Sequence, residues 1–195
     1  MSISLSQPVF SDNNISQTSN YGRVMPRVIS INESSLRYND YNPELQNEQK
    51  ARVKVVKQYK IDLINIVLND SFEAGVISQS ENYIDRYANK ENIEYIREAA
   101  NELYLENFSD PHILTGLLIM MGSLSYNDAY PQGQTMALGL LQHECITVRD
   151  RAIQVFERWN SKKGINVLKS LRCDRVWLQK YVDKVIQYLE RDGED

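Results

Sequence analysis

From residue 43 onward, apolar residues recur every three or four positions, which is the spacing of one face of an α-helix. In residues 43 to about 69 this apolar stripe consists of Val53, Val56, Tyr59, Leu63, Ile66 and Val67. The local alternation in RVKVV (residues 52–56) would suit a strand, but the periodic run is too long for one. We therefore predict a long amphipathic helix here.

Three further helices are predicted before residue 124. Residues 78–88 form a short helix, in which Ser78 and Glu81 have the spacing of a capping box. Residues 89 to about 107 form a helix with apolar residues on one face and glutamates on the other. The sequence Ser-Asp-Pro at 109–111 combines a polar N-cap with proline at the first helical position, so a third helix begins there. Because residues 113–121 are apolar nearly all round, this helix should lie in the core, and residues 127–128 and 131–133 should form a loop after it.

The last third of the chain contains an internal repeat. The apolar set Val148, Ala152, Val155, Phe156 and Trp159 recurs thirty residues later as Leu178, Val182, Val185, Ile186 and Leu189. Upstream, Leu138 and Leu141 correspond to Leu168 and Leu171, and Ile146 corresponds to Val176. Each unit is predicted to be a shorter helix, a tight turn and a longer helix. Such a unit must stack on a neighbour to bury both of its faces.

The segment LLQHECITVRDRAIQVF (residues 140–156) resembles the HEAT-type repeat of armadillo-type α-solenoid proteins. Leu140 and Leu141 match the leucine pair that closes the first helix of that repeat. Val148, Arg149 and Ala152 match the opening of its second helix. The resemblance covers residues 131–190 and implies a fold rather than a function.

The resemblance also implies a role for the arginine, which supports the turn between the two helices, often beside an aspartate. In this chain His143 occupies the aspartate position, so we expect weaker hydrogen bonding in the turn. The second unit keeps the apolar pattern but has Gln179 at the arginine position.

These patterns predict an all-α fold, a right-handed α-solenoid of helix-turn-helix (HEAT-like) repeats over residues 45–195. Residues 1–44 are rich in Ser, Asn and Gln and have no sustained period, which predicts a largely irregular, extended or disordered N-terminal arm. Within it, residues 23–31 (RVMPRVISI) could form a short extended piece. Tyr21, Tyr38 and Tyr41 would be contact residues if the arm binds a partner.

Composition agrees with one compact domain and an appended arm. In a chain of 195 residues, a hydrophobic share of 42% is enough for a core without disulfides. Cys145 and Cys173 fall inside apolar helical patterns, which predicts free thiols in a reduced, cytoplasmic setting. Residues 1–12 lack the basic start and apolar stretch of a signal peptide, and no apolar run approaches the roughly 20 residues that span a bilayer. We therefore expect no membrane association.

Charge is distributed unevenly around a net value of −4. Acidic residues predominate between residues 70 and 110, and basic residues between 147 and 190. This asymmetry is typical of solvated helix faces, or of an electrostatic docking surface for a charged partner. The candidate acidic partner surface is Glu91, Glu94, Glu98 and Glu102. The candidate basic partner surface is Arg151, Arg158, Lys162, Lys180 and Lys184.

No catalytic or metal-binding pattern is present in the sequence. His143, Glu144 and Cys145 are adjacent, so they should diverge from a turn rather than converge on a metal ion. The only other histidine is His112, and no glycine-rich phosphate loop is present. Three glutamates four residues apart on one helix face could hold a metal ion or a proton-transfer pair, but no matching Glu-x-x-His motif faces them. We therefore expect no cofactor, no metal and no enzymatic activity.

The function expected from the sequence is a non-enzymatic protein-binding module that uses a charged helical surface. Bacterial immunity or antitoxin-type inhibitors and adaptors are the classes that the acidic face suggests. One alternative is a nucleic-acid-binding HEAT-like protein, as in some DNA glycosylases, although the acidic net charge disfavours nucleic acid. A regulatory subunit of a larger complex is another. Trp159 lies on the apolar stripe and should be in the core, whereas Trp177 should be partly exposed.

Overall fold

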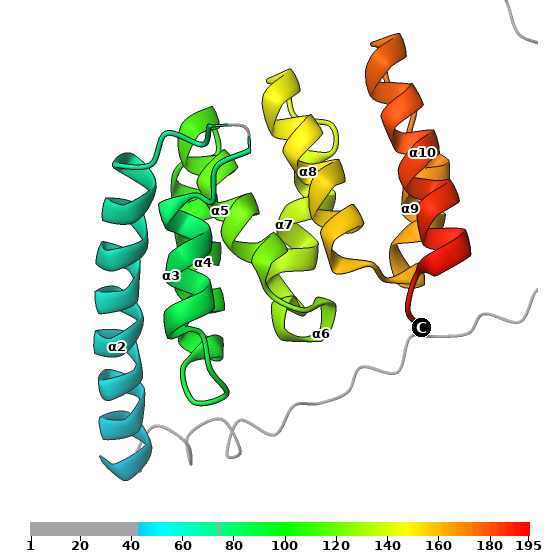
Figure 1. Ribbon diagram of the computed structural model, residues 1–195. Coiled ribbons are helices and arrows are strands. Elements are labelled where there is room, and N and C mark those ends of the chain that lie inside the picture. Colours follow the sequence, from blue (N-terminus) through cyan, green and yellow to red (C-terminus); the bar gives the residue numbers. More distant parts are fainter. Residues whose placement is uncertain (1–42, 74) are drawn as a thin grey trace, which may run out of the picture. The chain divides into compact units, whose positions relative to one another are not determined.

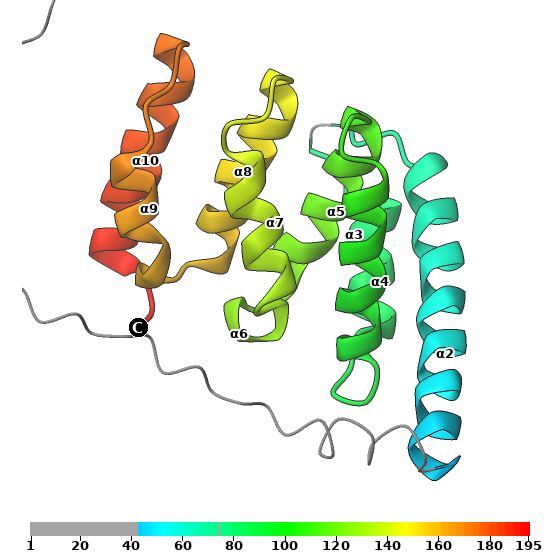
Figure 2. The same ribbon diagram turned by 180° about the vertical axis from the view of Figure 1, so that it is seen from behind.

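The computed structural model describes residues 43–73 and 75–195 (Figure 1; Figure 2). All described elements belong to one compact unit, Pro43–Asp195. The predicted arm therefore lies outside the described residues, together with residues 23–31, Tyr21, Tyr38 and Tyr41. The exceptions are positions 43 and 44, which belong to the first described helix.

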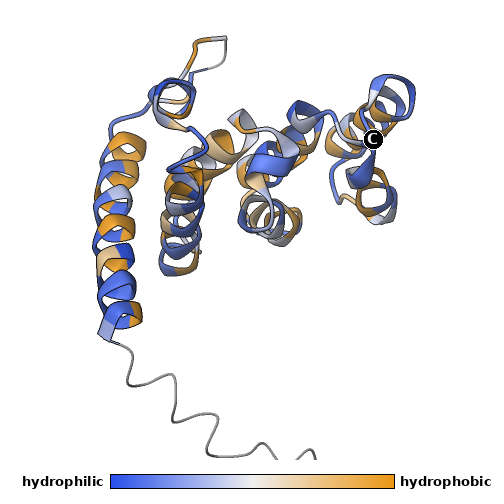
Figure 3. Cartoon of the chain, turned by 90° about the horizontal axis from the view of Figure 1, so that it is seen from below, coloured by the Kyte–Doolittle hydropathy of each residue, from blue (hydrophilic) through white to orange (hydrophobic). Residues whose placement is uncertain are grey.

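Helix α2 (Pro43–Leu68) is the long amphipathic helix that the periodicity predicts. Hydrophobic and hydrophilic positions alternate turn by turn along it (Figure 3). Val56, Leu63 and Val67 are buried, but Val53 is 66% exposed. The buried stripe is narrower than predicted because α2 packs mainly on α3, α4 and α5 and leaves one side open.

Helix α3 (Gln79–Tyr87) begins where the sequence predicts it. The Oγ of Ser78 accepts a hydrogen bond from the backbone N–H of Glu81 at 3.0 Å. The carboxylate of Glu81 pairs with Arg158 rather than returning to the cap. In the loop before α3, the buried carboxylate of Asp70 accepts the N–H of Ser80 at 2.7 Å, which anchors the start of the helix.

Helix α4 (Ile93–Glu106) starts four residues later than predicted. Asn89 accepts the N–H groups of Glu91 and Asn92, and the side chain of Asn92 accepts the N–H of Asn89. These side-chain bonds compete with helix formation, as asparagine often does, and make a turn instead. Helix α5 (Pro111–Ser123) confirms its predicted start, because Asp110 caps it and proline follows.

The segment after α5 is more helical than predicted. A short helix, α6 (Tyr126–Ala129), is capped by Ser125, whose Oγ accepts the N–H of Asp128 at 3.1 Å. Helix α7 (Gln132–Leu140) begins inside the predicted loop. The loop prediction was wrong for most of its residues, because a serine cap outweighs the turn tendency of the Asn-Asp pair.

The last third of the chain contains the shorter and longer helices that the sequence predicts there. The longer helices are α8 (Ile146–Trp159) and α10 (Val176–Asp192). The shorter ones are α7 and α9 (Ile165–Ser170), the latter preceded by a 3-10 turn, η2 (Lys162–Gly164). All five repeat positions of α8 are buried, and in α10 only Ile186 is partly exposed. Trp177 is 52% exposed, as expected.

The helices pack as neighbouring pairs, and the described residues contain no strand. Helices α3, α5, α8 and α10 form one row, in which each packs on the next. Behind them α4 packs on both α2 and α7, and α9 packs on α10. In Figure 1 the four helices of the first row run in the same direction, opposite to α2, α4 and α7. The described part of the chain is therefore all-helical, with two helices in depth.

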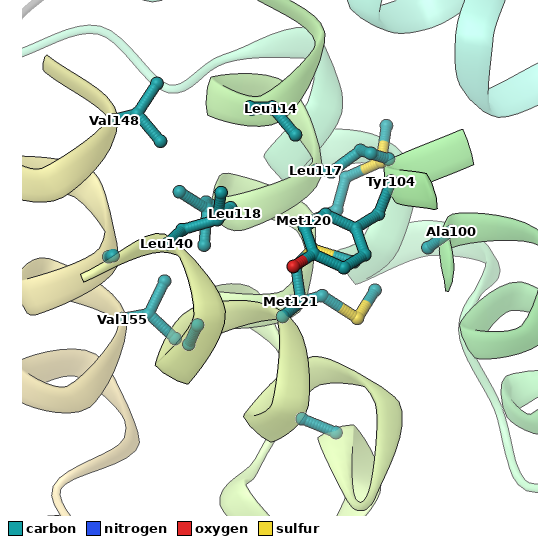
Figure 4. Close-up of a cluster of buried hydrophobic side chains, with 14 of the residues drawn as sticks. Ala100, Tyr104, Leu114, Leu117, Leu118, Met120, Met121, Leu140, Val148 and Val155 are labelled. Atoms are coloured by element: carbon teal, nitrogen blue, oxygen red, sulfur yellow. The ribbon is translucent and has the colours of Figure 1, made fainter. Parts of the chain in front are cut away.

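Helix α5 lies at the centre of the core, with residues 113–122 all buried. Gly116 lets α2 approach closely, since a Cβ there would lie 2.6 Å from a methyl carbon of Val67. Trp159 is buried as predicted and donates its indole N–H to the carbonyl of Met121 at 3.0 Å. Figure 4 shows the side chains that meet around α5: Ala100, Tyr104, Leu114, Leu117, Leu118, Met120, Met121, Leu140, Val148 and Val155.

Candidate protein-binding site

A mainly apolar hollow of about 710 Å³ lies between α2 and α3. We call it the tyrosine groove and define it by Val55, Tyr59, Ile66, Tyr83 and Tyr87. The α2 residues lie at helical spacing on one side of that helix, and the two α3 tyrosines are one turn apart. One smaller hollow shares the two α3 tyrosines with the groove. Another shares Val55 with it. The groove therefore continues along much of α2.

The aromatic rings of the tyrosine groove are held by neighbouring rings. Tyr83 and Tyr87 have centroids 4.9 Å apart, and Tyr59 stacks parallel to Tyr95 at 6.5 Å. Tyr87 is 55% exposed. Burial, with a smaller contribution from the carboxylate of Asp62, raises the pKa of Tyr83 to about 12. Its hydroxyl is thus a neutral donor and acceptor at the edge of an apolar surface, a combination enriched in protein interfaces.

A second hollow, the polar cavity, lies on a different side of α3 and measures about 310 Å³. Ile119 of α5 and Phe72 line its apolar part. Its charged lining residues are Glu73, Glu81, Asp150, Arg151 and Arg158. Thus α3 separates an apolar, tyrosine-rich hollow from a small charged one.

The predicted acidic surface faces cations of α2. Arg52 contacts Glu94 at 2.7 Å and Glu98 at 2.6 Å, and Lys60 contacts Glu102 at 3.3 Å. Lys60 also pairs with Glu106, at the end of α4. These pairs are partly exposed to solvent, so each adds little stability, but they compensate part of the negative charge. Glu91 lies in the turn before α4, exposed and without an ion pair in the described part of the chain.

The structure separates the predicted basic surface into three places. Arg151 and Arg158 line the polar cavity. Lys162 lies in η2 and contacts the carboxylate of Asp195 at 3.1 Å. Lys180 and Lys184 are exposed on α10. The five residues therefore do not form one patch, although α8 and α10 are neighbours.

His143 is buried in the turn between α7 and α8, where it makes two hydrogen bonds. Its Nδ1 accepts the N–H of Cys145 at 3.1 Å, so its Nε2 carries the proton that it donates to the carbonyl of Phe108, also at 3.1 Å. The expectation of a weakly bonded turn was therefore wrong, because imidazole can replace a carboxylate as acceptor and also supply a donor. His143 and Cys145 are structural parts of this turn.

The turns before α8 and α10, which belong to the two predicted units, are stabilised differently. Arg149 reaches forward to Asp174 in the turn of the next unit, at 2.7 Å. Gln179, at the equivalent position, reaches back and accepts the N–H of Cys173 in its own turn at 2.9 Å. The arginine of the first unit thus supports the turn that follows, not the one that precedes it.

Within residues 43–73 and 75–195, no group of three or more His, Cys, Asp or Glu side chains could hold a metal ion. The same residues contain no helix of sufficient length and apolarity to cross a bilayer. Both cysteines are free thiols, and each is partly buried.

Sequence reasoning did not identify the tyrosine groove. Tyr59 was assigned to the buried stripe of α2, and the tyrosines considered as contact residues were those of the N-terminal arm. The spacing of Tyr83 and Tyr87 was the available signal, since two aromatic residues one turn apart share a helix face. Which residues this helix face contacts depends on the packing of α2.

No protein family, curated protein or solved structure matches this chain. The likeness to HEAT-type repeats thus depends on the residues of this chain alone.

Proposed function

We propose that this chain is a non-enzymatic protein-binding module with the architecture of a HEAT-like α-solenoid. The observation that carries the proposal is the tyrosine groove. Exposed tyrosine beside aliphatic residues in an elongated hollow is the composition of interface hot spots. A protein segment lying along α2 would bury Val55 and Tyr87, which the described fold leaves partly exposed.

The helix arrangement supports the solenoid interpretation. At four of the five repeat positions, α8 and α10 both bury their residue, and each helix of the row α3, α5, α8 and α10 packs on the next. In solenoids, stacked units produce extended surfaces that bind other proteins.

Charge favours a basic partner, as an immunity or antitoxin-type inhibitor would have. Along the contact between α2 and α4, the four carboxylates Glu94, Glu98, Glu102 and Glu106 meet two cations, Arg52 and Lys60. Asp62 adds a further carboxylate at the groove. This local excess of carboxylates at the contact between α2 and α4 would favour a positively charged partner there, although Lys50, Lys54 and Lys57 of α2 offset it elsewhere on that helix.

The test is affinity capture from the native host with three forms of the full chain: wild type, Tyr87→Ala and Trp177→Ala. The two substitutions remove aromatic residues of similar exposure, 55% and 52%, from different helices. We expect a protein that binds wild type and Trp177→Ala alike and binds Tyr87→Ala about 30-fold more weakly, since a hot-spot residue contributes about 2 kcal/mol or more.

Equal binding by Tyr87→Ala and wild type would refute the groove as the site. Salt-sensitive binding to duplex DNA, without any captured protein, would refute the proposal in favour of a nucleic-acid-binding protein. A regulatory subunit would instead recover several proteins in fixed ratio, and these would still need Tyr87.

A further inference from the structure

Two carboxylates that line the polar cavity, those of Glu73 and Asp150, have no ion pair with any described residue, and Asp150 is the more buried of the two. Arg158 pairs with Glu81 across the cavity, and Arg151 donates to the side-chain oxygen of Gln154. Asp150 lines the same cavity, yet its carboxylate has no hydrogen bond or ion pair with any described residue. Three carboxylates against two arginines leave the lining of the cavity with an excess of one negative charge, and Asp150 is an acceptor that no described donor satisfies.

The position of Asp150 makes this unpaired state costly. It lies in the first half of α8, partly buried beside α5. Burial raises the pKa of its carboxyl, and the charge of Arg151 offsets only part of that effect. A partly desolvated carboxylate without a donor gains free energy when a cation with N–H donors enters the cavity.

The volume of the polar cavity limits the size of the group that it can bind. A volume of about 310 Å³ is at the lower end of the range of about 300–1,000 Å³ that ligand pockets occupy. It suits one long side chain better than an extended cofactor. The apolar surface of Ile119 and Phe72 would contact the methylene stem of such a side chain, while its charged end meets Asp150.

We propose that the polar cavity receives one lysine or arginine side chain of the protein partner, with Asp150 as its counter-ion. This inference rests on the proposed function and names the chemistry of the partner. Because α3 separates the cavity from the tyrosine groove, a partner segment that crosses α3 would engage both hollows. An anion is disfavoured because three carboxylates line the cavity against two arginines.

The probe is Nα-acetyl-arginine amide, added to the full chain and followed by backbone amide NMR. Nα-acetyl-citrulline amide has nearly the same shape without the charge, and inorganic phosphate represents an anion. We expect saturable shifts of the amides of Ser78 and Gln154 with the arginine compound, and at least tenfold weaker binding of the citrulline compound.

Two variants complete the experiment. Asp150→Asn preserves the size of the side chain and should weaken binding of the arginine compound at least tenfold. Glu144→Gln removes an exposed carboxylate elsewhere and should bind it like wild type. The NMR spectrum itself reports whether each variant is folded.

The inference is overturned if the citrulline compound binds equally well, if phosphate is the ligand that shifts these amides, or if Asp150→Asn binds arginine like wild type. None of these outcomes involves Tyr87 or a captured protein. A result that refutes the cation site in the polar cavity can thereby be distinguished from one that refutes the tyrosine groove as a protein-binding site.

Discussion

Ala152 offers a decisive test of the buried repeat, because it is fully buried in α8. Helix α8 packs on α5 on one side and on α10 on the other. Ala152→Glu places a longer, ionisable side chain at this contact. The expected result is loss of the packing that joins the two C-terminal units to the rest of the body.

The expected destabilisation by Ala152→Glu is the sum of two contributions. A fully buried carboxyl can be neutralised at pH 7 if its pKa rises by about 3 units, which corresponds to about 4 kcal/mol. Overpacking a filled core adds about 1–3 kcal/mol. A destabilisation of about 5–7 kcal/mol removes most of the roughly 5–15 kcal/mol by which a domain is stable. The melting temperature should fall by more than about 10 °C.

The assay is urea and thermal unfolding followed by circular dichroism, with Thr147→Glu as the control. Thr147 is exposed in the first turn of the same helix, where a carboxylate is tolerated or favourable. The pKa of a buried glutamate is raised on folding, so its cost increases as pH rises above the unfolded value of about 4.3. The deficit of Ala152→Glu should thus be larger at pH 8 than at pH 5. If Ala152→Glu melts at the same temperature as wild type, the repeat assignment is refuted.

Two further predictions concern buried polar groups. His143→Ala should lower the free energy of unfolding by about 2 kcal/mol, because the N–H of Cys145 loses its acceptor. Urea unfolding measures this, and an exposed neighbour, Gln142→Ala, should have no effect. Burial alone would raise the pKa of Asp70, but hydrogen bonds from Ser80 and nearby backbone N–H groups outweigh it and lower that pKa. The contribution of Asp70 is therefore present above the unfolded pKa of about 3.9 and is lost as pH falls through the lower folded pKa. The stability difference between wild type and Asp70→Asn should vanish there, and a constant difference down to pH 2 would contradict the assignment.

The helices and their buried faces could be predicted from the sequence because local chemistry determines them. Asp110 and Pro111 set the start of α5 through a cap and a fixed backbone angle. The thirty-residue repeat predicted most of the buried residues of α8 and α10, but its pair Ile146 and Val176 is not buried, and Val176 is 73% exposed. The prediction was wrong where side chains bond their own backbone, as at Asn89 before α4 and Ser125 before α6.

The candidate site could not be predicted in the same way. Periodicity shows which face of a helix is apolar, but not which polar residue of another helix lies opposite. Glu98 meets Arg52 across a separation of 46 residues, and Asp150 meets no donor among residues 43–73 and 75–195. These outcomes depend on how neighbouring helices cross and in what register they pack. By itself, the sequence thus determined the helices and the apolar faces they bury. Only the tertiary structure decided which charges are paired and where Tyr83 and Tyr87 form a groove with α2, because those contacts join positions that no local pattern relates.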